Sequence, residues 1–385
     1  YREMVEYSCK NYAQNIAYKY KKDYTAKNVE YIEKTYEQVG KDIKAFGTGL
    51  LNLDLMGERI VVVGKNRYEW CISYLATTCS NMVIVPIDKA LPDIEMQRLI
   101  ERSEAKAIIF DEKYLETIKK VQEKENSNLK TLICMDNIQE KGIKTFNEIL
   151  EEGRNQIKNG DQKYDNIEID ENKMSIMLFT SGTTNEPKAV MLSQANICAN
   201  ISNIACWVKL YPTDVLLSFL PIHHTFECTI TFLYGFYSGS QVAFCDGLKH
   251  IQQNLKEYKV SVFVAVPLVL ETMYKKIQKA IEEQGKTGLI KKMTKISNTL
   301  LKAKIDIRKI VFKQILDNFG GHLRVVLYGA APMNKATIIG YNNLGISLVQ
   351  GYGLTETSPV LAGENDKYKR DGSVGFALPG IEIKI

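Results

Sequence analysis

The chain has 385 residues, of which 45% are hydrophobic and 25% charged, and its formal net charge is +5. These are ordinary values for globular proteins, and a chain of this length can bury a large core without disulfide bonds. The excess is mild and no long single-sign block accompanies it, so neither a concentrated basic face nor nucleic-acid binding is expected. Residues 286–295 are basic, and the simplest interpretation is a solvated helix face.

The eight cysteines are scattered and form no CxxC pair, which indicates a reducing compartment rather than a disulfide framework. No signal peptide is visible after Tyr1. The longest apolar run, residues 260–270, is shorter than the about 20 residues that a membrane span needs. A cytoplasmic chain without a transmembrane segment is therefore expected, while peripheral membrane contact and oligomeric state stay open.

Short β-branched runs alternate with amphipathic segments along the chain. In chain order, the predicted strands are residues 59–63, 82–87, 107–110, 131–135, 175–179, 215–219, 241–244, 260–266, 323–327 and 347–350. The predicted helices are residues 68–80 and 92–102, with further long helices within 277–319. Such alternation predicts parallel sheets with helices on both faces.

Two other regions differ in character. Residues 126–172 are more polar and are predicted to be peripheral. Residues 372–380 are rich in glycine, and residues 381–385 alternate like a strand. Because a strand needs a partner, a further β-structure is predicted to begin here and to be interrupted at Ile385.

The strand predicted at 175–179 runs into a hydroxyl-rich turn that contains one lysine. Hydroxyls, backbone N–H groups and an ammonium group are the donors that a polyphosphate needs in a small space. The turn is not a Walker A loop, because Pro187 precedes the lysine and the spacing differs. An ordinary surface loop is the alternative. The candidate phosphate-binding residues are Thr180, Ser181, Gly182, Thr183, Thr184 and Lys188.

This turn resembles the phosphate-binding signature T-S-G-[ST]-T-G-x-P-K-G of the adenylate-forming superfamily, which includes acyl-CoA synthetases. Asn185 and Ala189 stand where that signature has glycine. Asparagine tolerates a positive φ better than most residues, so Asn185 can keep the turn. Ala189 adds a methyl group where the backbone is expected to pack closely.

A second segment, residues 350–357, matches the superfamily motif Y-G-x-T-E. Tyr352 offers a flat face for adenine, and Thr355 is implied to reach the α-phosphate. Glu356 is the implied Mg²⁺ ligand, because Mg²⁺ prefers a carboxylate together with phosphate oxygens. Gln350, Gly351 and Gly353 complete the segment, and the glycines let the backbone approach a ligand.

The segment Gly329, Ala330, Ala331 and Pro332 is similar to the superfamily's G-[AG]-[AG]-P turn, which lines the adenine and acyl sites. Small residues there leave room for a ligand. A tight turn packed against a helix is the alternative interpretation.

Two of the four histidines are adjacent, at His223 and His224. Residues 220–227 resemble L-P-x-x-H-x-x-E of acyl-CoA synthetases, which implies that His224 lies beside the carboxylate and the pantetheine path. A zinc site with Glu227 lacks further ligands of convincing spacing, and a buried, hydrogen-bonded histidine is the other alternative. The apolar run 229–236, expected to be helical, fits either core or a ligand pocket.

Residues 308–324 and 372–382 are similar to segments of long-chain fatty acyl-CoA synthetases. The resemblance implies two packed α/β subdomains with intertwined boundaries over about residues 1–359, and an incomplete β-barrel over about 360–385. The family's mobile C-terminal domain is expected beyond Ile385. The implied reaction converts a medium- or long-chain fatty acid and ATP into acyl-AMP, and then into a thioester with coenzyme A.

In that mechanism Lys188, Thr355 and Mg²⁺ on Glu356 are implied to stabilise developing phosphate charge, with His224 near the acyl carbonyl. The family takes a second lysine from its C-terminal domain, so the 385 residues alone are expected to bind nucleotide but to be catalytically incomplete. Two alternatives stay open. One is an enzyme that stops at acyl-AMP or transfers the acyl group to a carrier protein, and the other is a non-catalytic nucleotide- or acyl-binding protein.

Overall fold

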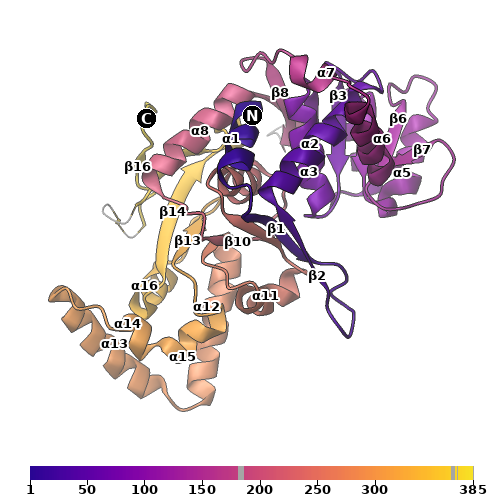
Figure 1. The fold of residues 1–385 in the computed structure, drawn as a ribbon. Coiled ribbons are helices and arrows are strands. Elements are labelled where there is room, and N and C mark those ends of the chain that lie inside the picture. The colour runs from indigo at the N-terminus through magenta and orange to yellow at the C-terminus, as the bar shows by residue number, and fades with distance from the viewer. Residues whose placement is uncertain (181–185, 366–368, 371, 385) are drawn as a thin grey trace.

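The computed structural model of the chain describes residues 1–180, 186–365, 369–370 and 372–384. Two β-sheets lie on either side of a shared helical layer, and further helices cover their outer faces (Figure 1). The predicted α/β architecture is confirmed, but each sheet is mixed rather than wholly parallel.

The first sheet has seven strands, parallel except for the last. Residues 60–63 of its central strand β3 are fully buried, as in sheets covered on both faces. Ile60 and Val62 belong to the core shared with the other sheet, whereas Val61 and Val63 pack under α4 (Asp93–Ser103) and α5 (Leu115–Gln122). The strand order is β7 (Ile143–Thr145), β6 (Thr131–Cys134), β5 (Ala107–Phe110), β3 (Arg59–Val63), β4 (Val83–Pro86), β8 (Met174–Thr180) and β9 (Lys188–Ser193).

The second sheet has nine strands, and its centre is parallel. Its outer face is covered by α11 (Ile251–Glu257), α12 (Pro267–Glu283) and α16 (Lys335–Leu344). The N-terminal hairpin β1–β2, which the sequence did not predict, closes one edge. The strand order is β16 (Phe376–Ala377), β15 (Val360–Gly363), β14 (Ser347–Gly353), β13 (Val325–Tyr328), β12 (Val262–Ala265), β10 (Val215–Ser218), β11 (Gln241–Phe244), β1 (Ile16–Lys21) and β2 (Tyr31–Thr35).

The C-terminal segment differs from the expectation. Strands β15 and β16 extend the nine-stranded sheet in antiparallel fashion, and no barrel is formed by the described residues. The strand expected at 381–385 is absent over residues 381–384. Gly380 takes a positive φ of 75° and Ile381 N donates to Leu378 O, so a turn leads the chain away from β15.

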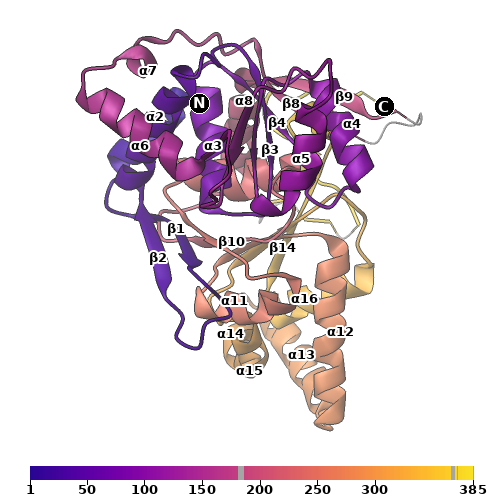
Figure 2. The same ribbon diagram turned by 90° about the vertical axis from the view of Figure 1, so that its right-hand side faces the viewer.

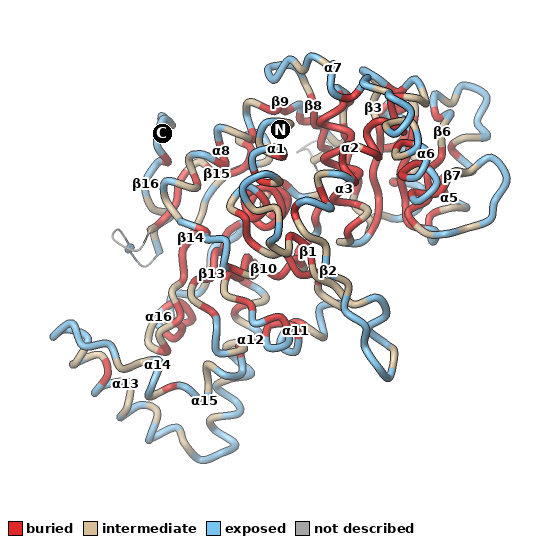
Figure 3. The backbone as a smooth tube through the Cα atoms, viewed as in Figure 1, coloured by how far each residue is buried: buried red, intermediate tan, exposed pale blue. Residues whose placement is uncertain are grey.

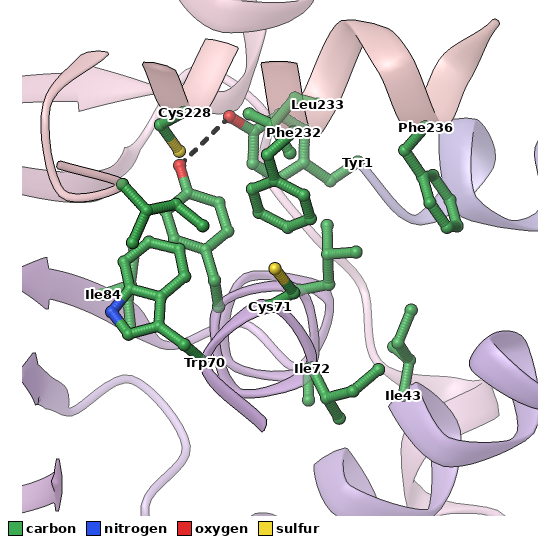
Figure 4. Packing of buried hydrophobic residues seen from close by; sticks show 14 of the residues in the cluster. Tyr1, Ile43, Trp70, Cys71, Ile72, Ile84, Cys228, Phe232, Leu233 and Phe236 are labelled. Carbon is green, nitrogen blue, oxygen red and sulfur yellow. Dashed lines mark hydrogen bonds between the residues drawn. The ribbon is translucent and has the colours of Figure 1, made fainter. Parts of the chain in front are cut away.

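The shared layer joins the two sheets through aromatic and aliphatic side chains. Helix α3 (Tyr68–Cys79) packs against a π-helical turn, η2 (Cys228–Tyr234), which replaces the ordinary helix expected at 229–236. Figure 4 shows Trp70 and Cys71 of α3 on the side of the helix towards Phe232 of η2, whereas Ile72 lies on the side towards Ile43. Because almost no part of this layer is exposed, it fixes one sheet relative to the other.

Three helices begin with capping boxes, in which the N-cap side chain and the side chain three residues later satisfy each other's backbone N–H groups. They are α2 (Tyr36–Leu51), α6 (Phe146–Lys158) and α8 (Gln194–Trp207), capped by Thr35, Thr145 and Ser193. Two further helices, α1 (Arg2–Asn11) and α7 (Lys163–Asn166), contact α2.

A group of helices extends below the nine-stranded sheet, away from the seven-stranded one (Figure 2). It confirms the helices expected within 277–319, although the first begins earlier, at Pro267. After α12 it contains α13 (Thr287–Lys302), α14 (Arg308–Val311) and α15 (Lys313–Leu316). Within the described ranges, no helix is both long and apolar enough to cross a bilayer.

Helices α2 and α6 approach so closely that glycine is required at their contact. A Cβ atom at Gly153 would lie 1.8 Å from Ala45 O, whereas a Cβ atom at Gly288 in α13 would have no neighbour within 4 Å. We expect Gly153→Ala to lower the free energy of unfolding by about 1–3 kcal/mol or more, through overpacking. Gly288→Ala should leave it unchanged or raise it by up to about 1 kcal/mol. Urea denaturation compares the two, and equal effects would contradict the packing described.

Glu227 is a fully buried carboxyl group that precedes the π-helical turn. Its Oε2 accepts a hydrogen bond from Thr231 Oγ1 at 2.8 Å, while Oε1 has no hydrogen-bond partner among the described residues. Burial raises the pKa of Glu227 to about 8, against the lowering effect of the nearby Ser218 and Thr231 hydroxyls. The group is therefore a neutral acid over much of the physiological range.

A raised pKa in the folded state makes the stabilising contribution of Glu227 largest below the unfolded pKa of 4.5. That contribution is lost as the pH rises towards 8, by up to about 1.4 kcal/mol per pH unit. Glu227→Gln cannot ionise, so its stability relative to the original protein should increase between pH 5 and 8. Denaturation at several pH values measures this difference, with the exposed Glu116→Gln as a control for charge loss. A difference that stays constant with pH would refute the buried neutral acid.

Candidate active site

A pocket of about 490 Å³ opens where strands of the seven-stranded sheet end. The carboxyl ends of β4 and β8 form one wall, and the segments that follow β10 and β14 form the other. Such a position beyond the ends of parallel strands is where ligands bind in α/β folds. Its apolar lining consists of Pro86, Ile87, Leu91, Leu99, Leu178 and Phe179.

The candidate phosphate loop connects β8 and β9 along the chain, and these two strands pair as an antiparallel hairpin. Thr180 is paired with Lys188 in the strand register, and Thr180 and Pro187 both line the pocket. Lys188 is exposed, and no described carboxylate forms an ion pair with it. The remaining candidates, Ser181, Gly182, Thr183 and Thr184, lie outside the described residues, as does Asn185.

Two observations refine the expectations for this hairpin. Glu186 accepts hydrogen bonds from Arg98 at 2.9 Å and Arg102 at 3.3 Å, so α4 is joined to the residue that precedes Pro187. Ala189 is exposed opposite Phe179, so its methyl group does not crowd the backbone, contrary to expectation. The alanine is therefore compatible with the hairpin.

The two adjacent histidines both line the pocket and lie close to Asp88. Their ring centroids are 4.4 Å apart, and His223 Nε2 is 3.8 Å from Asp88 Oδ2. Burial, followed by the neighbouring His224, lowers the pKa of His223 to about 4, and burial also lowers the pKa of His224. Both imidazoles are therefore neutral near pH 7, and each offers one N–H donor and one acceptor.

Asn66, which sequence reasoning missed, holds the histidine segment in place. Its Nδ2 donates to Ser218 Oγ at 2.9 Å and to Leu220 O at 2.7 Å, linking the end of β3 to the end of β10. Asp88 and Arg98 were missed as well. Asp88 follows the end of the parallel strand β4, so that positional rule could have indicated it. Arg98 lies within α4, and nothing in the sequence joined it to the distant Glu186.

Strand β14 continues to Gly353, beyond the end at residue 350 that the sequence predicted. The Y-G-x-T-E segment therefore begins inside this strand. Gly353 is required there, because a Cβ atom would lie 1.8 Å from Pro359 O. A 3₁₀ turn, η5 (Thr355–Thr357), follows and brings Thr355 to the pocket. Tyr352 is 46% exposed and Glu356 is exposed, so both are accessible to a ligand.

Helix α8 anchors this segment from the shared layer. Asn200 Nδ2 donates to Val360 O at 2.7 Å, and Val360 N donates to Asn200 Oδ1 at 3.2 Å. Gln350 points inward instead of to the surface, since its Oε1 accepts a hydrogen bond from Tyr328 OH at 2.9 Å. Its side chain supports the strands from behind.

The Gly-Ala-Ala turn connects the other motifs. A Cβ atom at Gly329 would lie 2.9 Å from Gly351 O and 3.4 Å from Phe226 Cε2. This glycine therefore touches both the Y-G-x-T-E strand and the histidine segment. Ala330, with a φ of 69°, and Ala331 are exposed at the end of β13.

Metal binding by protein groups alone is not supported within the described ranges, where no three histidine, cysteine or acidic side chains cluster. This applies to the zinc alternative at His224 and Glu227, since Glu227 is fully buried. A single exposed carboxylate at Glu356, on a turn next to β9, fits a Mg²⁺ ion that takes its other ligands from phosphates and water. In chemical terms, the site combines an apolar pocket, neutral imidazoles, hydroxyls and an exposed lysine.

Curated proteins of similar sequence include long-chain fatty acid–CoA ligases. Mouse long-chain-fatty-acid–CoA ligase 6 is 29% identical over 378 residues, which cover 91% of this chain and 53% of the mouse protein. Long chain acyl-CoA synthetase 4 of Arabidopsis thaliana is 26% identical, covering 92% of this chain and 57% of the plant protein. The chain thus spans about half the length of these relatives.

Solved structures show the same fold. A long-chain-fatty-acid-CoA ligase from Archaeoglobus fulgidus superposes with a TM-score of 0.75 at 18% identity, covering 98% of this chain and 68% of that one. The N-terminal domain of FACL13 from Mycobacterium tuberculosis gives a TM-score of 0.73 at 18% identity, with coverage of 98% and 82%. The family described as AMP-binding enzyme matches residues 5–385. The chain therefore belongs to the AMP-binding enzyme family.

Proposed function

We propose that the complete protein is a fatty acid–CoA ligase. It would join a medium- or long-chain fatty acid to ATP, forming acyl-AMP and pyrophosphate, and then transfer the acyl group to coenzyme A with release of AMP. The observation that carries the proposal is one pocket in which Thr180, His223, His224 and Thr355 meet beside an apolar lining. Family membership and the names of the relatives support it.

The nucleotide would lie along the ends of β13 and β14. Tyr352 is exposed enough to stack on adenine, and the small residues Gly329, Ala330 and Ala331 leave space beside it. The phosphates would then extend towards Thr355 and the β8–β9 hairpin, whose lysine is accessible. Hydroxyls, backbone N–H groups and one ammonium group suit a polyphosphate.

The fatty acid carboxylate would lie by the histidines, with its chain among Leu91, Leu99 and Leu178. A neutral imidazole can orient the carboxylate through one N–H group without forming an ion pair. The carboxylate keeps more of its nucleophilic character in this way, because a full positive charge would stabilise the ground state as well. The lowered pKa values of His223 and His224 support this role.

Attack on the α-phosphorus places additional negative charge on phosphate oxygens. Thr355 would donate a hydrogen bond to the α-phosphate, and Lys188 would balance charge on the departing pyrophosphate. A Mg²⁺ ion held by Glu356 and the phosphates would supply further positive charge. The apolar lining would exclude water, which protects the acyl-AMP from hydrolysis.

The proposal is tested with the full-length protein, ATP, Mg²⁺ and a panel of acids from acetate to long-chain fatty acids. Pyrophosphate release should depend on a fatty acid, and a thioester should form with coenzyme A. Release without any thioester, or transfer only to an acyl carrier protein, would overturn the coenzyme A step. Nucleotide binding without acid-dependent pyrophosphate release would indicate a binding protein and overturn the ligase.

Lys188 provides a prediction that separates phosphate binding from adenosine binding. Lys188→Gln should weaken ATP binding about tenfold or more, because it removes a charged donor near the terminal phosphates. AMP, which lacks those phosphates, should bind almost unchanged. Isothermal titration calorimetry measures both affinities, and Lys173→Gln, at the opposite end of the same hairpin, is the matched control. An equal loss for ATP and AMP would place the lysine elsewhere.

A further inference from the structure

The helices that extend below the nine-stranded sheet carry a charge unlike the rest of the chain. Residues 267–319 contain twelve lysine or arginine and five acidic residues, a net charge of +7. Because the whole chain has +5, the remaining residues sum to −2. The basic character of this protein is therefore concentrated on one projecting element (Figure 2).

The strongest part is α13 with its flanking turns, residues 284–305, here called the α13 surface. It holds six lysines and no aspartate or glutamate. No ion pair is formed by the α13 surface with the described carboxylates. This segment is more than the ordinary solvated helix face expected from the sequence, since such faces usually mix both signs of charge.

Aliphatic side chains lie among these lysines. Leu289 is 53% exposed, Ile296 48% and Ile305 52%. Leu289, Lys292 and Ile296 are spaced by three and four residues, so they share one side of α13. Lys291 and Lys295 are four residues apart and form a neighbouring row, in which Lys291 is exposed at the groove between α13, α12 and α16. The exposed side of the helix therefore carries both apolar side chains and cations.

The opposite side of α13 is fixed to the body of the protein. Ser297 is fully buried, and Asn298 Nδ2 donates to Asn343 Oδ1 of α16 at 2.8 Å. Figure 3 shows exposed and half-buried backbone along most of the helix, with buried colour only in its middle. Because these contacts fix the orientation of α13, the helix cannot rotate to bury Leu289 and Ile296.

We propose that the α13 surface docks the protein on an anionic lipid surface. Lysines beside exposed aliphatic side chains are the pattern by which a helix lies in a membrane interface, with the cations at the headgroups and the apolar groups below them. Nucleic acid fits less well, because residues 284–305 contain no arginine to fork a phosphate and no aromatic residue to stack on a base. This inference does not depend on the proposed reaction.

The test is co-sedimentation of the full-length protein with vesicles of phosphatidylcholine, with or without phosphatidylglycerol. The protein should bind only the vesicles that contain phosphatidylglycerol, and high salt should release it. The combined variant Lys291→Gln, Lys292→Gln and Lys295→Gln should lower the partition coefficient about tenfold or more. Failure of the original protein to bind anionic vesicles would overturn the proposal.

Matched variants separate docking from general electrostatic attraction. Changing three exposed lysines on the seven-stranded side, Lys141, Lys158 and Lys173, to glutamine removes the same charge and should leave vesicle binding nearly unchanged. An equal loss in this control would overturn the assignment to α13. Circular dichroism and ATP affinity verify that each variant is folded.

The apolar contribution is tested with Leu289→Gln and Ile296→Gln together, which keep every lysine. Vesicle binding should fall severalfold, while binding to an unrelated double-stranded DNA should not change. The exposed Met56→Gln is the control for loss of an apolar side chain elsewhere. Two results would contradict the lipid assignment. One is unchanged vesicle binding by the Leu289 and Ile296 double variant, and the other is a loss of DNA binding alone by the triple lysine variant. Either result would mean that the α13 surface makes electrostatic contact with another polyanion.

Discussion

The packing of α3 against the π-helical turn η2 is the contact on which the rest of the structure depends. Trp70 of α3 stacks on Tyr74 and meets Phe232 of η2 edge to face, with centroid distances of 5.5 and 6.2 Å. This interface lies between the sheets, so it sets the distance between the end of β4 and the end of β10. The pocket lies between the ends of β4 and β10. Asn66 fixes the end of β10 to the end of the neighbouring strand β3 through two hydrogen bonds.

The same burial determines the charge state of the pocket. It removes solvent from the histidine segment, so the pKa values of His223 and His224 fall and that of Glu227 rises. All three groups change in the direction of their neutral forms, as desolvation requires. The positive groups of the site, including Lys188, stay at its exposed rim, where they can meet a charged ligand without a large desolvation cost.

Much of the fold could be predicted from local patterns. The buried strands at 59–63 and 107–110 are continuous β-branched or aliphatic runs, which are typical of parallel sheets covered on both faces. The hairpin β1–β2 could not be found in this way, because no residue of Tyr31–Thr35 is buried and the segment has no apolar run. Strand β9 was not predicted either, because Lys188 and Ala189 are exposed and only the pairing with β8 makes the segment a strand.

The residues of the candidate site also fall into two groups, those that a local sequence motif indicates and those whose partners lie far away in the sequence. The motif residues at 180, 224 and 355 could be proposed from the sequence because each belongs to a short motif that resembles one of the adenylate-forming superfamily. Their supports could not, because Asn66, Arg98 and Asn200 act on partners 88 or more residues away. The inward orientation of Gln350 also follows from a neighbouring strand, through the hydroxyl of Tyr328.

We propose that one pocket binds both the nucleotide and the acyl group. The most direct measurement is an experimental structure with a non-hydrolysable acyl-AMP analogue. In that complex adenine should lie against Tyr352 and the Gly329–Ala331 turn, the phosphate mimic beside Thr355, and the acyl chain among Leu99 and Leu178. An analogue bound at another surface, or an acyl chain that leaves this pocket empty, would contradict it.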